Sequence, residues 1–219
     1  MKKAVSFSQP PTVKICGIRV QETLDALQTL PDPPEYIGFV FAASRREITP
    51  DVFSTLRFGT LKSRKVGVFV NPTLAFIDHV LDHGALDMIQ LSGDASETWV
   101  KTVRERYGLP VIKTYRPEGR IPDRGLEADV ILLDTSLPGQ YGGTGKTFDW
   151  SHIERWRPMT LKWGKPLWVA GGIHAENVST LLQAYVVDGI DVSSGVETHG
   201  QKDMSKIKAL LEAVRKPLG

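Results

Sequence analysis

The 219-residue sequence has little cysteine, no long apolar run and almost no excess of charge. Its single cysteine excludes an internal disulfide and favours a reducing compartment. No apolar stretch approaches the ~18 residues of a membrane-spanning helix, and the start of the chain lacks the apolar core of a signal peptide. A net charge of +2 indicates no basic face for nucleic acid. We therefore expect a cytoplasmic globular protein without membrane or nucleic-acid partners.

Short apolar runs and helical patterns alternate through almost the whole chain. We expect residues 1–12 to form a flexible extension and residues 13–219 to form one domain. Eight runs have the composition of buried strands: Val13–Cys16, Tyr36–Phe41, Lys65–Val70, Asp87–Leu91, Pro110–Tyr115, Asp129–Asp134, Pro166–Ala170 and Gly189–Ser193. Helical patterns lie between them: Glu22–Leu30, Ala95–Tyr107, Trp150–Arg157, Ala175–Tyr185, Met204–Arg215, and two that begin with the N-cap candidates Thr49 and Asn71, each followed by proline.

This even alternation predicts a fold of parallel strands joined by helical crossovers. Eight such units close into a (β/α)₈ TIM barrel, which we favour over an open doubly wound sheet. The segment between the fifth and sixth strands is rich in proline and glycine (Pro117, Gly119, Pro122 and Gly125). We expect the helix there to be short or absent.

In such a barrel the active face is built from the residues that follow each strand. Gly171 and Gly172 follow the seventh strand, and Ser194 and Gly195 follow the eighth. Each turn leads toward a helix and presents backbone N–H groups, which is the usual phosphate site of this fold. The alternative is that these glycines only form tight turns.

Asp134 and Cys16 follow strands on either side of this predicted phosphate site. A carboxyl and a thiol that flank a bound sugar phosphate form a plausible acid and base pair. Cys16 could instead be a small buried hydrophobe. Lys14 lies two residues earlier, so its side chain points the same way, either favouring the thiolate or forming a structural ion pair.

Three other patterns require interpretation. Arg46, with Arg45, follows the second strand and could clamp a substrate carboxylate or belong to a solvated loop. Residues 142–147, GGTGKT, are similar to a nucleotide-binding P-loop, but Gln140 stands where its first glycine is required. His79 and His83 are four apart but lack the glutamate of a zinc-protease helix, so we expect no metal.

Taken together, the strand-end motifs match those of one family along nearly the whole chain. They are VKICGI at 13–18, GFVF with S-x-R at 38–46, VGVFVN at 66–71, IQL-x-G at 89–93, LLDT at 132–135, YGGTGKTFDW at 141–150, AGGI at 170–173 and DVSSGVE at 191–197. The sequence thus resembles the phosphoribosylanthranilate isomerases of tryptophan biosynthesis. The resemblance implies a TIM barrel that rearranges a sugar-phosphate substrate, acts as a monomer or homodimer, and needs no cofactor or metal.

The resemblance also implies roles for individual residues. Cys16 would be the general base and Asp134 the general acid, while Arg46 would meet the anthranilate carboxylate. The remaining substrate contacts would come from Asp191 and from the phosphate loops: Gly171, Gly172, Ser194 and Gly195. The sequence departs from the family at Ser92, where many members have histidine, and at Arg45, where proline or lysine is common.

Three rival functions are weighed against this assignment. A histidine-pathway isomerase would be expected to have paired aspartates and an internal half-barrel repeat, and the sequence has no clear repeat. An indoleglycerol phosphate synthase would be expected to have catalytic lysine and glutamate at several strand ends. A catalytically silent barrel would bind the phosphometabolite without turnover.

Overall fold

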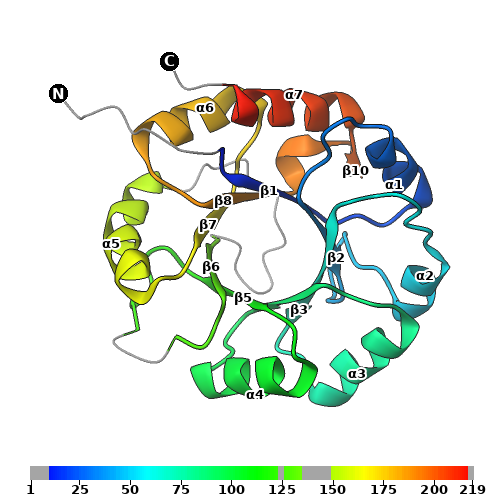
Figure 1. Ribbon diagram of the computed structural model, residues 1–219, viewed down its shortest axis with the longest axis horizontal. Helices are drawn as coiled ribbons and strands as arrows, with labels where there is room; N and C mark the ends of the chain where they lie inside the picture. Colours follow the sequence, from blue (N-terminus) through cyan, green and yellow to red (C-terminus); the bar gives the residue numbers. More distant parts are fainter. Residues whose placement is uncertain (1–9, 123–125, 135–148, 217–219) are drawn as a thin grey trace.

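The computed structural model describes residues 10–122, 126–134 and 149–216, and within them eight parallel strands form a closed barrel in the order β1 to β8 (Figure 1). The strands are β1 (Thr12–Cys16), β2 (Tyr36–Val40), β3 (Arg64–Val70), β4 (Met88–Ser92), β5 (Val111–Tyr115), β6 (Val130–Leu133), β7 (Leu167–Ala170) and β8 (Gly189–Val192). Pairing of β1 with β8 closes the ring, with Lys14 opposite Asp191. The predicted TIM barrel is confirmed.

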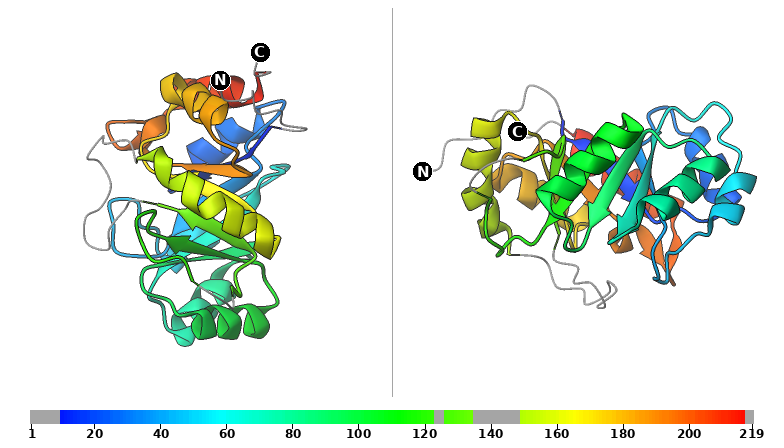
Figure 2. Two further views of the ribbon diagram at one scale, coloured as in Figure 1. Left: turned by 90° about the vertical axis from the view of Figure 1, so that its left-hand side faces the viewer. Right: turned by 90° about the horizontal axis from the view of Figure 1, so that it is seen from below.

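Helices form an outer layer around the strands, as the side views make plain (Figure 2). They are α1 (Gln21–Gln28), α2 (Pro50–Thr55), α3 (Leu74–His83), α4 (Glu97–Tyr107), α5 (Ile153–Trp163), α6 (Ala175–Ala184) and α7 (Met204–Arg215), with short 3₁₀ helices η1 (Trp150–His152) and η2 (Ser194–Val196). A small hairpin of β9 (Glu197–Thr198) and β10 (Gln201–Lys202) follows η2. No helix lies in residues 116–122 or 126–129, the described parts of the β5–β6 connection.

Most boundaries agree with the predicted ones, but one helix end and one cap do not. The helix predicted to end at Arg157 continues through Pro158 to Trp163. Thr49 caps α2 as predicted, accepting a hydrogen bond from the Val52 N–H, with Pro50 at the first helical position. The prediction that Asn71 caps the next helix was wrong, because Thr73 caps α3. Asn71 instead adopts a positive φ of 46°, and its side chain accepts a hydrogen bond from the Asp94 N–H.

The start of the barrel lies close to the predicted domain boundary. β1 begins at Thr12, and Pro11 is buried beside it, so both belong to the folded part. Residues 1–9 of the predicted extension lie outside the described residues, as do Pro138, Gly139 and the GGTGKT stretch after Asp134. Within the described ranges, none of the helices is both long and apolar enough to cross a membrane.

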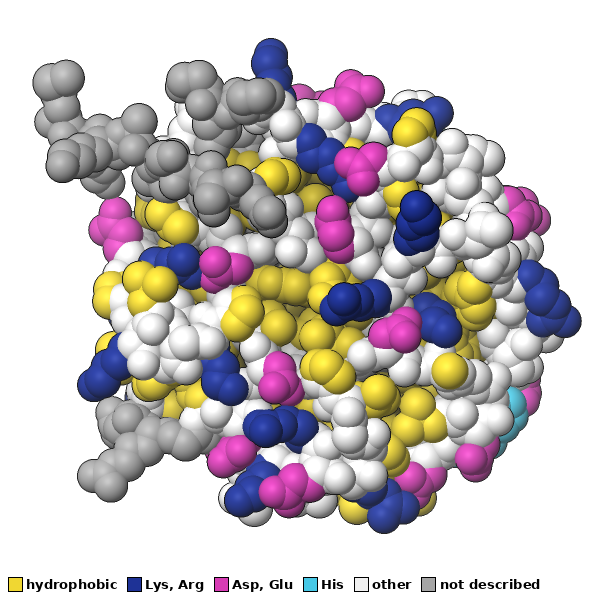
Figure 3. All heavy atoms as spheres, viewed as in Figure 1, with side chains coloured by type: hydrophobic (Ala, Val, Ile, Leu, Met, Phe, Trp, Pro, Cys, Tyr) yellow, Lys and Arg dark blue, Asp and Glu magenta, His cyan; other side chains and the backbone are white. Residues whose placement is uncertain are grey.

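The apolar core has two layers because side chains alternate along each strand. The larger layer packs between the strands and the helices, and includes Ile15 of β1. The smaller layer fills the barrel interior and includes Cys16 and Trp168. On the face seen in Figure 3, basic and acidic side chains are interspersed around an apolar centre. Because side chains alternate along β1, Lys14 and Cys16 both point to the interior of the barrel, as the sequence predicts.

Candidate active site

Cys16 ends β1 with its side chain buried inside the barrel, where it is only 8% exposed. Its neighbour across the sheet is Gly38 of β2. A Cβ atom at Gly38 would lie 2.9 Å from Cys16 Sγ and 3.1 Å from Lys14 Cε. A residue without a side chain is therefore needed there, since it leaves room for the thiol and the lysine stem together.

Lys14 is fully buried and held by two partners from opposite parts of the ring. Its ammonium donates to Asp191 Oδ2 at 2.8 Å and to Gln90 Oε1 at 2.9 Å. Burial opposes its charge, but Asp191 and Cys16 outweigh that effect and raise the pKa of Lys14. The structural ion pair considered from the sequence is therefore present.

The expectation that Lys14 favours the thiolate is only partly met. Burial raises the pKa of the Cys16 thiol, and this effect outweighs the opposite influence of Lys14 and Lys202. The charge of Asp191 adds to the increase, because it neutralises Lys14 and repels a thiolate. The surroundings of Cys16 therefore favour the neutral thiol over the thiolate, although the two nearby ammonium groups oppose this effect.

Polar side chains continue from Lys14 across the barrel to β5. Gln90 also donates to Ser92 Oγ at 3.3 Å, and the Ser92 and Thr114 hydroxyls lie 3.0 Å apart. On the other side of Lys14, Asp191 Oδ1 is buried and has no hydrogen-bond partner among the described residues. A hydrogen-bond donor on a bound ligand would satisfy this oxygen.

Asp134 directly follows β6, so it lies at the same end of the barrel as Cys16. Its backbone N–H donates to the Tyr115 carbonyl at 3.1 Å, which extends the pairing of β6 with β5 by one residue. The residue is partly buried. The predicted acid and base thus follow two strands on either side of β7 and β8.

The two predicted phosphate turns pack directly against each other. Gly171 and Gly172 have φ of 92° and 65°, values that favour glycine. At Gly195, a Cβ atom would lie 1.9 Å from the Ile173 carbonyl oxygen, so only glycine permits this approach. Asn177 secures the first turn, since its amide donates to the Gly172 carbonyl and accepts from the His174 N–H.

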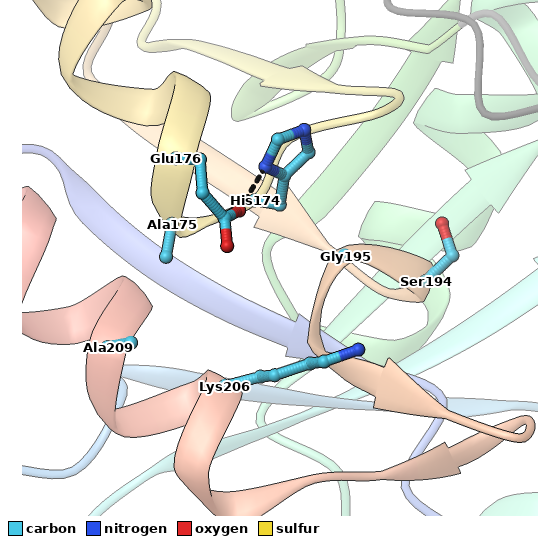
Figure 4. A pocket seen from close by; sticks show the side chains of 7 residues that line it. All are labelled: His174, Ala175, Glu176, Ser194, Gly195, Lys206 and Ala209. Atoms are coloured by element: carbon cyan, nitrogen blue, oxygen red, sulfur yellow. Dashed lines mark hydrogen bonds and ion pairs between the residues drawn. The ribbon is translucent and has the colours of Figure 1, made fainter.

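A cavity of ≈330 Å³ opens beside these turns (Figure 4). It is lined by His174, Ala175, Glu176, Ser194, Gly195, Lys206 and Ala209, which come from the start of α6, from η2 and from α7. Ser194 and Gly195 therefore border a hollow, whereas Gly171 and Gly172 do not line it. The side chain of Lys206 reaches along it and donates to the Glu197 carbonyl at 2.7 Å.

Arg46 is less exposed than a solvated loop residue would be, with 12% of its side chain accessible. Its stem lies over Gly17, where a Cβ atom would be 2.6 Å from Arg46 Cδ. Its guanidinium donates from Nε and Nη2 to the two carboxylate oxygens of Glu197, at 2.7 and 3.0 Å. Nη1 of Arg46 makes no hydrogen bond to the described residues, so this nitrogen can donate a hydrogen bond to a ligand.

Glu197 and Lys202 were not predicted as site residues. Lys202 donates to Glu197 Oε1 at 2.8 Å and to the Ser193 carbonyl at 3.0 Å. Burial would raise the pKa of Glu197, but Arg46 and Lys202 lower it to about 2. The signal that could have found this pair is His199-Gly200, a two-residue hairpin loop placed between the glutamate and the lysine.

The two histidines of α3 form a local contact. Their rings pack 4.5 Å apart, and His83 also contacts the Asp51 carboxylate at 3.3 Å. Among the described residues, no group of three or more histidine, cysteine, aspartate or glutamate side chains could hold a metal ion.

A comparison with known protein families shows to which family this chain belongs. The family model described as N-(5'phosphoribosyl)anthranilate (PRA) isomerase matches residues 13–213. The chain belongs to the PRA isomerase family. The family assignment made from the strand-end motifs is thereby confirmed.

Individual PRA isomerases are similar over nearly their whole length. The enzyme of Brevibacillus brevis is 41% identical over 211 residues, which cover 93% of each chain. The structure from Thermotoga maritima is 33% identical, with a TM-score of 0.76, and is matched over 94% of this chain and 100% of that one. A PRA isomerase solved in complex with reduced 1-(o-carboxyphenylamino)-1-deoxyribulose 5-phosphate is 30% identical, with a TM-score of 0.73 and the same coverage. Another Thermotoga structure is described as monomers generated from the dimeric enzyme.

Proposed function

We propose that this protein isomerises N-(5-phosphoribosyl)anthranilate to 1-(2-carboxyphenylamino)-1-deoxyribulose 5-phosphate, a step of tryptophan biosynthesis. Its family membership supports this reaction. The observation that carries the proposal is the placement of Cys16 at the end of β1 and of Asp134 directly after β6, on either side of the two packed glycine turns. A substrate phosphate at those turns would lie between a carboxyl and a thiol.

The substrate contacts follow from the charges and open hydrogen-bonding groups of the site. The phosphate binds to backbone N–H groups of Gly171, Gly172, Ser194 and Gly195. Arg46 Nη1 meets the anthranilate carboxylate, and the unpartnered Asp191 Oδ1 accepts a hydrogen bond from a sugar hydroxyl. These contacts orient the sugar between the acid and the base.

The reaction then requires two proton transfers. Protonated Asp134 donates to the ribose ring oxygen as the C–O bond breaks, while the anthranilate nitrogen supplies electrons to form an iminium. The Cys16 thiolate removes the C2 proton, which the iminium has made acidic, and the resulting enolamine tautomerises to the ketone. Lys14 and Lys202 stabilise the thiolate during this step, because their positive charges oppose the rise in the pKa of Cys16 that burial causes.

Turnover of the fluorescent substrate tests the proposal directly. We expect the purified protein to consume N-(5-phosphoribosyl)anthranilate and its gene to restore a tryptophan auxotroph that lacks this step. Binding without turnover would instead identify a catalytically silent barrel. Single-turnover rates of Cys16→Ser and Asp134→Asn should fall by roughly 10² to 10⁴-fold, because each loses a proton transfer. A parent rate in either variant would refute the role given to that residue.

The pH dependence offers a second test of the pair. Asp134 and Cys16 share one proton in the active form, so the rate should be bell-shaped in pH. The shared proton is lost above the pKa of Cys16. Since burial raises this pKa, the alkaline limb should lie above the ordinary thiol value of ~8.5.

We further propose that the enzyme works in the cytoplasm, because its lone cysteine must remain a free thiol. It acts as a monomer or homodimer, which sedimentation at assay concentration distinguishes. No cofactor or metal enters the proposed steps.

A further inference from the structure

Glu197 lies at the centre of a cluster of three basic side chains at the mouth of the barrel. Its carboxylate is 5% exposed and accepts hydrogen bonds from Arg46 and Lys202. Arg45 adds a third contact, from Nη2 to Glu197 Oε2 at 3.1 Å. Three cations around one carboxylate leave an excess of positive charge beside the site proposed for the substrate carboxylate.

The β9–β10 hairpin places this carboxylate in a defined position. His199 and Gly200 both have positive φ, of 51° and 77°, as a tight two-residue hairpin loop requires. The register sets Lys202 opposite Glu197, so the lysine reaches the carboxylate across the ladder. Arg19 ties the hairpin to the loop after β2, donating to the Gly200 and Arg45 carbonyls.

We propose that Glu197 is a positioning residue, which holds the Arg46 guanidinium in the orientation that binds the substrate carboxylate. This inference rests on the proposed function, because it assumes that Arg46 meets that carboxylate. Glu197 occupies Nε and Nη2 of Arg46 and thereby directs Nη1 away from the hairpin. An arginine oriented before binding loses less side-chain entropy when the ligand arrives.

A purely structural role for Glu197 predicts different behaviour. A residue that only stabilised the loop after β8 would affect every ligand of the site, since the phosphate turn at Ser194 and Gly195 belongs to that loop. A positioning residue affects only ligands that carry the carboxylate. The distinction can be measured with matched ligands, with and without that group.

The experiment compares Glu197→Gln with a matched control, Asp78→Asn. Asp78 also accepts two hydrogen bonds from one arginine, Arg106, but it lies on outer helix α3. In Glu197→Gln, the KM for N-(5-phosphoribosyl)anthranilate should rise about 10 to 100-fold, because a charge-assisted contact orients Arg46. Its kcat should change much less, and Asp78→Asn should match the parent in both constants.

Inhibition by two reduced product analogues completes the test. The inhibition constant of reduced 1-(2-carboxyphenylamino)-1-deoxyribulose 5-phosphate should rise with KM in Glu197→Gln, whereas that of its phenylamino counterpart without the carboxylate should stay near the parent value. Equal weakening of both inhibitors, or a loss confined to kcat, would overturn the inference. Glu197→Asp retains the charge but shortens the side chain, so it provides the same comparison if Glu197→Gln does not fold.

Failure of this inference is distinguishable from failure of the proposed function. If the parent does not turn over its substrate, the proposed function is wrong. If the parent is active and Arg46→Ala discriminates between the two inhibitors, but both Glu197 variants bind them as the parent does, only the positioning role is wrong.

Discussion

Removal of the Lys14 ammonium should destabilise the barrel strongly. Lys14 is fully buried and Asp191 is 7% exposed, and they form an ion pair across the β1–β8 seam. Lys14→Met preserves the length of the side chain but leaves a buried carboxylate without its partner. Breaking a buried pair in this way costs about 3–5 kcal/mol of the free energy of unfolding. Asp191→Leu should have a similar cost, because it leaves the ammonium unpaired.

The double variant separates the pair from its surroundings. Lys14→Met with Asp191→Leu removes both charges, and the chief polar loss is then the hydrogen bond to Gln90 Oε1. An unsatisfied buried acceptor costs about 1–3 kcal/mol. The double variant should therefore be much more stable than the sum of the two single costs predicts, with a coupling energy of several kcal/mol.

Urea unfolding at pH 7 measures the free energy of unfolding of the parent, the two single variants and the double variant. The measurement does not depend on enzymatic activity. Lys14 carries its charge there, since its environment raises the pKa of this lysine. That stabilisation is present below the ordinary lysine pKa of ~10.4 and is lost as the pH rises through the folded-state value. A free energy of unfolding of Lys14→Met within about 1 kcal/mol of the parent value would contradict this prediction. Simple addition of the costs of the two single variants would contradict it too, because the ion pair would then not stabilise the pairing of β1 with β8.

Three further predictions concern the mouth of the barrel. Arg46→Ala should weaken binding of the carboxylated inhibitor about 10 to 100-fold and affect its decarboxylated counterpart much less; equal effects in equilibrium titrations would make Arg46 structural and Arg45 the candidate. Gly172→Val should weaken phosphate binding by calorimetry, whereas Gly108→Val, at a similar φ of 62° but with open space around it, should not; equal affinity in both would count against the phosphate turn. Glu197 has a pKa of about 2, so its stabilisation should be present above ~4.3 and disappear as the pH falls toward 2. The difference in unfolding free energy between parent and Glu197→Gln should shrink over that interval, and a constant difference would show that the charge is not responsible.

Sequence patterns alone determined the architecture, and they placed each strand end to within one residue. Periodicity and turn chemistry are local properties, so the alternation of apolar runs with capped helices was enough to predict eight parallel strands. The same reasoning placed Cys16 and Asp134 at strand ends and placed Lys14 on the same side of β1 as Cys16. The Asn71 cap was wrong because the pattern of polar residue and proline does not reveal a competing contact, here with the Asp94 N–H.

Only the tertiary structure decided the direction in which the pKa of Cys16 shifts and the partners with which the charged residues of the site form ion pairs. The pKa of Cys16 depends on burial and on Asp191, which is 175 residues away in the sequence and reaches Lys14 through the closure of the ring. Glu197 meets Arg46 because a hairpin after β8 folds back over the loop after β2. Contacts of this kind depend on distances between remote segments, and those distances are defined once the barrel has closed.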